Sequence, residues 1–201
     1  MAEHDRLTKA SRPYRLRARA AAMDRTRERI THAAVELHGT IGPAATTMSA
    51  VAELAGVTRA TLYRHFPNET ALFTACSTDW LAANPRPDPA GWAAVADPVR
   101  RLGAALAELY AYYRSTEQMR SNLLRDIDVI PERFRPGIVG FPPTTIQVLE
   151  AGRPELEGAH LRHAAIGHAV AFETWRSLAK EGLTDQEAAD MMVRFVTGIG
   201  N

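Results

Sequence analysis

The sequence predicts an all-α protein made of a small N-terminal helix-turn-helix domain and a larger helical body. Three observations lead to this fold class. Two short capped helices flank a glycine turn within residues 46–66, and apolar side chains recur at helical spacing from there to the chain end. The proline-rich stretch 84–89 interrupts this helical pattern and separates the N-terminal domain from the body. We expect four segments: an N-terminal arm (1–23), the helix-turn-helix domain (24–67), a connecting helix (68–83) and the helical body (84–201).

The helix-turn-helix unit reads TTMSAVAELAGVTRATLYRHF. Its first helix has one apolar face, made of Met48, Val51, Ala52 and Ala55. Thr47 can cap this helix, and Gly56 can adopt the left-handed conformation that stops it. Thr58 can cap a second helix, which Pro67 ends. Two short helices with a turn of this length form a helix-turn-helix.

The second helix carries an unusual outward face. Leu62 and Phe66 can point inward, whereas the remaining side chains are Arg59, Ala60, Thr61, Tyr63, Arg64 and His65. This face holds no acid, although a solvated helix normally mixes both charges. Guanidinium, hydroxyl and methyl groups suit a helix in a DNA groove, where they meet phosphates and base edges. The alternative is a mildly basic exposed helix in a helix-turn-helix that serves only as scaffold.

Residues 46–72 resemble the DNA-binding signature of the tetracycline-repressor (TetR) family of bacterial transcriptional regulators. The resemblance rests on the TT pair, the AxxAGV turn, the TLYRHF helix and the Ala71–Leu72 pair. It extends back through a first helix whose matching side chains are Ile30, Ala33, Ala34 and Leu37. The resemblance implies a ligand-responsive regulator, most commonly a repressor, whose C-terminal helical domain binds an effector and dimerises.

The resemblance also implies how the chain would contact double-stranded DNA. Arg59, Thr61 and Tyr63, beside Ala60, are expected in the major groove. The expected phosphate contacts are Thr47, Thr58, Arg64 and His65. A homodimer would present two recognition helices about 34 Å apart to a pseudo-palindromic operator. Effector binding would change the angle of the helix at 68–83 and so weaken the fit to DNA.

Three positions depart from the family pattern. His38 replaces a common aromatic residue, Ala60 a common glycine, and Glu69 a lysine that approaches a DNA phosphate in many members. Glu69 suits a helix N-terminus but repels phosphate. It is the one residue that favours a rival function, a small-molecule-binding or enzymatic protein that has lost DNA binding. An activator with the same fold is a second alternative.

Charge is divided unevenly along the chain, although the net charge is only +1. Residues 1–67 hold 11 Lys and Arg against 6 Asp and Glu, whereas residues 68–201 hold 13 against 17. A basic front on an acidic body would orient the molecule towards a polyanion. Residues 1–23 predict a disordered basic arm, which either reaches DNA or is a plain extension.

The body is expected to be helical throughout. Asp97-Pro98 begins one helix, a second follows around residues 119–130, and prolines divide residues 131–157 around a short helix at about 144–151. A helix over 158–180 is apolar on two sides, and a Thr184–Glu187 capping box opens the last one. Surplus apolar surface on these last two long helices predicts a homodimer through a four-helix bundle; the alternative is a monomeric core.

Aromatic residues in the body predict an apolar or aromatic effector. The candidate lining residues are Tyr110, Tyr113, Met119, Phe134, Phe141, His168, Phe172 and Trp175. For each of them core packing is the simpler role.

The sequence predicts no enzyme, no cofactor and no metal site. It has no G-x-S-x-G, H-E-x-x-H, Walker or G-x-G-x-x-G motif. His160 and His163 lie one turn apart without a third ligand in pattern. The single cysteine, Cys76, is expected to be buried and inert, which is consistent with a reducing cytoplasm. No stretch approaches a membrane span, and the basic N-terminus lacks the apolar core of a secretory signal.

Overall fold

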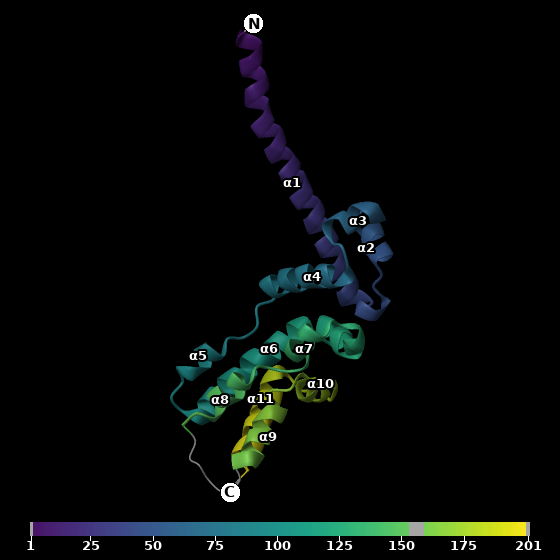
Figure 1. The fold of residues 1–201 in the computed structure, drawn as a ribbon. Coiled ribbons are helices and arrows are strands. Elements are labelled where there is room, and N and C mark those ends of the chain that lie inside the picture. Colours follow the sequence, from purple (N-terminus) through teal and green to yellow (C-terminus); the bar gives the residue numbers. More distant parts are fainter. Residues whose placement is uncertain (1, 153–158, 200–201) are drawn as a thin grey trace. The chain divides into compact units, whose positions relative to one another are not determined.

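The computed structural model describes residues 2–152 and 159–199, and within these ranges all regular structure is helical (Figure 1). The all-α prediction is confirmed. The chain forms two compact units, Met1–Ala83 and Asn84–Asn201. None of the described helices is both long enough and apolar enough to cross a membrane.

The first unit is built on one long helix. It contains α1 (Ala2–Thr40), η1 (Pro43–Ala45), α2 (Met48–Leu54), α3 (Arg59–His65) and α4 (Glu69–Ala83). The C-terminal part of α1 packs against α2 and α4, and α2 packs against α3 (Figure 1). Fully buried side chains from these helices form one core, namely Ile30, Ala34, Val51, Leu62 and Phe66.

Helix α1 is much longer than the sequence pattern predicts. We expected a disordered arm over residues 1–23 and a helix from Arg25, but the structure is helical from Ala2. Every side chain from Leu16 to Arg25 is exposed, so tertiary packing does not explain the extension. The segment 17–22 reads RARAAA, and alanine and arginine have among the highest intrinsic helix propensities. Propensity therefore extends the helix where no apolar stripe exists.

His38 and Cys76 form a buried pair in this unit. His38 is 8% exposed, its ring centroid lies 5.5 Å from that of Phe73, and its Nδ1 lies 3.6 Å from the Cys76 Sγ. Burial lowers the pKa of His38 to about 4, so the ring is neutral near pH 7. A neutral imidazole thus packs against the Phe73 ring in this core. Burial likewise raises the pKa of Cys76 to about 12, which keeps the thiol protonated and unreactive.

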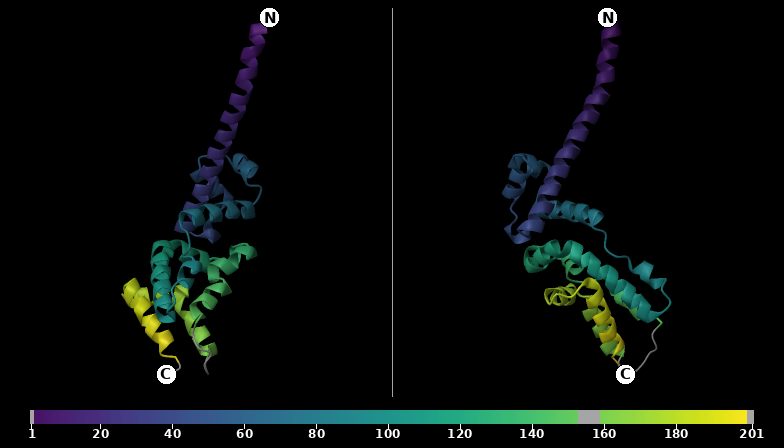
Figure 2. Two further views of the ribbon diagram at one scale, coloured as in Figure 1. Left: turned by 90° about the vertical axis from the view of Figure 1, so that its left-hand side faces the viewer. Right: turned by 180° about the vertical axis from the view of Figure 1, so that it is seen from behind.

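The second unit surrounds α6 (Pro98–Arg125), a helix of 28 residues. The other elements are α5 (Pro89–Ala93), η2 (Ile127–Val129), η3 (Glu132–Phe134), α7 (Arg135–Val139), α8 (Pro143–Glu150), α9 (Ala159–Ala169), α10 (Phe172–Lys180) and α11 (Asp185–Thr197). Helices α5, α7, α8, α10 and α11 all pack against α6, which runs along the unit in Figure 2. The predicted separate helix around 119–130 is largely the C-terminal part of α6.

Two tyrosines hold a break between α9 and α10. We expected one helix over 158–180, but the chain leaves helical conformation at Val170 and Ala171. The Tyr110 hydroxyl donates to the Ala169 carbonyl (2.8 Å), and the Tyr113 hydroxyl donates to the Val170 carbonyl (2.5 Å). These bonds from α6 satisfy backbone groups that the break would leave unpaired. Burial raises the pKa of both phenols, so they remain donors.

The last helix starts as predicted. The Thr184 Oγ1 accepts from the Glu187 amide (3.2 Å), and the Glu187 carboxylate accepts from the Thr184 amide (2.8 Å). This confirms the capping box at the start of α11.

Candidate nucleic-acid interface

Local side-chain bonds fix the two helices of the helix-turn-helix. The Thr47 Oγ1 accepts from the Ala50 amide at 3.1 Å and starts α2. Gly56 has a φ of 63°, which side chains disfavour, and it turns the chain after α2. The Thr58 Oγ1 accepts from the Thr61 amide at 3.2 Å and starts α3. All three predicted roles are confirmed.

Helix α3 presents an exposed basic and aromatic face. Leu62 is fully buried, as is Phe66 just after the helix, which leaves Arg59, Tyr63 and Arg64 exposed on the other side. Tyr63 is 41% exposed, and the Arg59 guanidinium lies 6.0 Å from its ring centroid. Ala60 lies on the same exposed surface, and Thr61 is half-buried at its edge. Because α3 holds no acidic side chain, this face can meet phosphates and base edges without repulsion.

Two of the predicted phosphate contacts, Thr47 and Thr58, already use their hydroxyl groups in hydrogen bonds within the chain. Thr47 and Thr58 are exposed, but their oxygens cap α2 and α3. The Thr58 hydroxyl also donates to the Thr61 Oγ1 at 3.0 Å. The main role of these hydroxyl groups is therefore to cap the N-termini of α2 and α3. A contact with phosphate would use their remaining hydrogen-bonding capacity.

Arg27 of α1 is a residue that sequence patterns missed. Its Nη1 donates to the His65 carbonyl at 3.1 Å, and its guanidinium lies 4.2 Å from the centre of the Phe66 ring. A cation at this point complements the negative end of the α3 dipole and fixes its orientation. Burial lowers the pKa of His65, and the nearby Arg64 and Arg27 lower it further. Because the shift is downward from the ordinary histidine pKa, the His65 ring is mostly neutral near pH 7. No sequence motif marks Arg27, because it lies 38 residues from His65.

Glu69 lies exposed in the first turn of α4. The Asn68 Oδ1 accepts from the Ala71 amide at 2.8 Å and caps this helix. The Glu69 carboxylate stabilises α4 because it lies at the positive end of the helix dipole. It also adds an acid just after the basic face of α3.

The effector candidates fall into two groups in the second unit. Tyr113 lies at the centre of an aromatic cluster, with ring centroids 5.3 Å from Phe172, 5.9 Å from Trp175 and 6.3 Å from Phe141. Tyr110 is also buried beside Tyr113, at 6.2 Å. The structure thus brings five of the eight candidates together.

The other three candidates lie apart from the cluster's ring contacts. Met119 is buried on α6, and Phe134 is half-buried with the Arg133 guanidinium 4.7 Å from its ring centre. His168 was expected on a buried stripe of a continuous helix. It is exposed near the end of α9, with its ring 6.1 Å from Phe195 and Nδ1 3.3 Å from the Thr174 hydroxyl.

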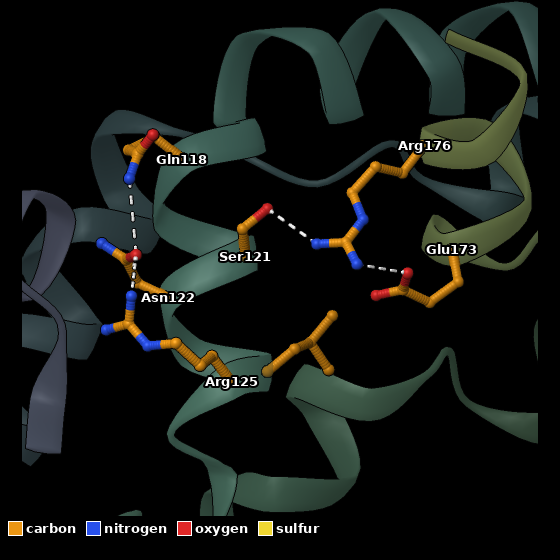
Figure 3. Close-up of a pocket in the computed structure, with 7 residues that line it drawn as sticks. Gln118, Ser121, Asn122, Arg125, Glu173 and Arg176 are labelled. Carbon is orange, nitrogen blue, oxygen red and sulfur yellow. Dashed lines mark hydrogen bonds and ion pairs between the residues drawn. The ribbon is translucent and has the colours of Figure 1, made fainter. Parts of the chain in front are cut away.

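A polar pocket of about 530 Å³ lies between α6 and α10 and includes none of the eight candidates (Figure 3). Its lining residues are Gln118, Ser121, Asn122, Leu124, Arg125, Glu173 and Arg176. Arg176 pairs with Glu173 at 2.8 Å and donates to the Ser121 hydroxyl at 3.4 Å. The aromatic residues of the sequence indicated the cluster around Tyr113 instead, and no sequence pattern predicted this pocket.

His163, one of the two histidines considered for a metal, pairs instead with a carboxylate. Its Nδ1 lies 3.0 Å from the Glu150 Oε1. Across residues 2–152 and 159–199, no three His, Cys, Asp or Glu side chains gather in an arrangement that could hold a metal ion.

Comparison with known proteins places the helix-turn-helix in a family. Residues 30–76 match the profile of the bacterial regulatory proteins, tetR family. No curated protein matches the chain.

Several solved structures share the fold. A TetR-like transcriptional regulator from Rhodococcus sp. RHA1 has 18% identity and a TM-score of 0.57, over 88% of this chain and 97% of that one. NalD, the secondary repressor of the MexAB-OprM multidrug efflux pump in Pseudomonas aeruginosa, has 22% identity and a TM-score of 0.53, over 87% and 95%. The profile match lies within the unit that forms the exposed basic helix, so residues 30–76 form a DNA-binding helix-turn-helix of the tetR family of bacterial regulatory proteins.

Proposed function

We propose that the chain is a cytoplasmic repressor that binds a pseudo-palindromic operator as a homodimer and leaves it when a small apolar or aromatic effector binds. The exposed face of α3 carries the proposal. It combines Arg59, Tyr63 and Arg64 with no acid, inside the segment that matches the family. We assign Arg59, Thr61 and Tyr63 to base edges, and Thr47, Thr58, Arg64 and His65 to phosphates.

Exposed apolar side chains on α9 and α11 support the homodimer. Leu161 is 53% exposed on α9, and Met191 and Phe195 are 48% and 46% exposed on α11. These two helices pack against each other, so their exposed faces can form one surface. Exposed apolar side chains that lie on adjacent helices are typical of an interface between subunits. Because the chain breaks at residues 170–171, the proposed bundle uses α9 and α11 rather than one helix over 158–180.

The aromatic cluster around Tyr113 supports an apolar or aromatic effector. Tyr113, Phe172 and Trp175 are each at most 4% exposed and lie within ring-contact distance of one another. Planar apolar ligands are commonly bound by such walls.

Fluorescence anisotropy with the DNA that flanks the protein's own gene tests the function. We expect specific binding that weakens steeply between about 50 and 200 mM salt, because bound Arg side chains displace counterions from phosphates. Random DNA of the same length is the control. If neither flanking DNA nor sequences selected from a random pool are bound better than the control, the DNA-binding proposal is wrong.

Glu69→Lys is expected to strengthen operator binding several-fold, because it exchanges an acid for the cation that many related sequences carry there. The gain should shrink as salt rises, which distinguishes a phosphate contact from a change in folding. Glu69→Gln is the matched control and should give a smaller gain. Unchanged affinity in Glu69→Lys at low salt would show that this position lies away from the DNA.

A further inference from the structure

Two buried arginines on α6 have very different surroundings. Arg101 is 5% exposed and Arg120 is 6% exposed. The Arg101 guanidinium donates to four backbone carbonyls at 2.5–3.2 Å, those of Val95, Ala96, Val148 and Ala151. Its hydrogen-bonding needs are met within the fold, and it joins α6 to the end of α8 and to the loop before α6.

Arg120 has far fewer partners. Its Nη2 donates to the Ile138 carbonyl at a long 3.3 Å, and its buried Nε has no hydrogen-bond partner. Among the described residues no carboxylate forms an ion pair with it. A buried charge that no carboxylate compensates is costly to the folded state, and a bound anion would offset that cost.

A second guanidinium approaches the same place. The Arg86 Nη2 donates to the Gly137 carbonyl at 2.7 Å, next to the residue that Arg120 binds. The buried Arg86 Nε also lacks a hydrogen-bond partner. Burial lowers the pKa of Arg120, and the nearby Arg86 lowers it further. Tyr113 raises this pKa, as does Tyr112, which also forms a hydrogen bond with Arg120. A buried and a half-buried cation therefore lie beside α7, and the described residues supply no acid that pairs with either.

An apolar wall lies beside these donors. The Arg120 guanidinium is 5.1 Å from the ring centres of both Tyr113 and Phe172. Both rings belong to the aromatic cluster proposed for the effector. Cationic donors next to aromatic rings match a molecule with an anionic head and an apolar body.

We propose that the effector is an organic carboxylate whose anionic group pairs with Arg120 and Arg86 and whose apolar body lies on Tyr113 and Phe172. The inference deepens the proposed function by naming the chemical class of the effector. Guanidinium groups suit this role because their planar donors match two carboxylate oxygens. The Gly137 and Ile138 carbonyls occupy one donor of each arginine, and the proposed ligand would bind the Nε groups.

Thermal unfolding of the full chain without DNA tests the ligand class. The probes are benzoate, phenylacetate and decanoate, each compared with its uncharged amide at the same concentration, with inorganic phosphate as a further probe. We expect at least one carboxylate to raise the Tm in a concentration-dependent way, while its amide and phosphate do not. If none of the carboxylates shifts the Tm, or if the amides act equally, the proposal is wrong. Stabilisation by phosphate alone would also overturn it, because a free inorganic anion would then be the ligand.

Arg120→Met and Arg101→Met are a matched pair of variants. Arg120→Met should leave the Tm of the free chain unchanged or raised, because it removes a poorly compensated buried cation. It should weaken carboxylate binding about tenfold or more, the effect of losing a charge-assisted hydrogen bond. Arg101→Met should lower the Tm by several degrees, since it leaves four carbonyls unpaired, yet it should keep the carboxylate response.

Two results would show that Arg120 is structural. The first is a decrease in Tm in Arg120→Met as large as that in Arg101→Met. The second is an increase in Tm on adding carboxylate that is the same in Arg120→Met as in the wild type. Since these measurements contain no DNA, they are independent of the operator titration. A chain that binds its operator but no carboxylate would retain the proposed function and lose this inference.

Discussion

Arg59→Ala is expected to bind the operator about 10- to 100-fold more weakly than the wild type, the usual effect of losing one side chain that reads a base. Arg59 is exposed in the first turn of α3, where its guanidinium lies over the Tyr63 ring. That stacking holds the side chain along the exposed face before DNA binds. Tyr63→Ala should therefore lose affinity as well, and the double variant should lose less than the sum of the two effects.

Lys180→Ala is the matched control for Arg59→Ala. It removes one exposed positive charge at the end of α10, in the other unit of the chain. Anisotropy with operator and with random DNA should show a loss of specificity for Arg59→Ala and little change for Lys180→Ala. Equal losses on both DNAs in Arg59→Ala would instead assign this residue to phosphates. Full affinity in Arg59→Ala would remove α3 from the interface.

Trp175→Ala is expected to lower the free energy of unfolding by about 3–5 kcal/mol, as for other fully buried aromatic residues replaced by alanine. Trp175 is completely buried and contacts the rings of Tyr113 and Phe172. Its Nε1 donates to the Asp185 Oδ1 at 2.9 Å, and Asp185 also pairs with Arg114 at 2.8 Å. The substitution thus opens a cavity and removes a bond between α10 and the start of α11.

Urea unfolding followed by circular dichroism measures this loss. Trp175→Phe is the control, because it keeps most of the apolar volume and removes only the indole donor. Asp185 retains Arg114, so this variant should lose only about 1–2 kcal/mol. Equal stability of the alanine and phenylalanine variants would show that packing at this position contributes little.

The helix-turn-helix was predictable because its signals are local. Thr47, Gly56 and Thr58 act through bonds or dihedral angles within a few residues of themselves, and the apolar stripes of α2 and α3 are short and regular. The exposed face of α3 followed from the same periodicity. Arg27 could not be found this way, because its bond to the His65 carbonyl joins distant parts of the chain.

The body was predicted less well because its decisive contacts are tertiary. The apolar pattern over 158–180 continues through the break, which depends on hydroxyl groups of Tyr110 and Tyr113 from another helix. Likewise, Arg101 and Arg120 look alike in a sequence, and only the structure shows that one is satisfied and the other is not. The effector candidates were chosen by aromatic content, which identified the cluster but not the cations beside it.

The buried pair of Cys76 and His38 gives the DNA-binding unit an internal reporter. Cys76 is the single cysteine of the chain and is 3% exposed, and burial holds its thiol protonated. Alkylation by a thiol reagent therefore requires α4 to separate from α1, and its rate measures how often that opening occurs. The alkylation rate of Cys76 thus measures the opening of the DNA-binding core in the unlabelled native chain, both in the presence and in the absence of operator DNA.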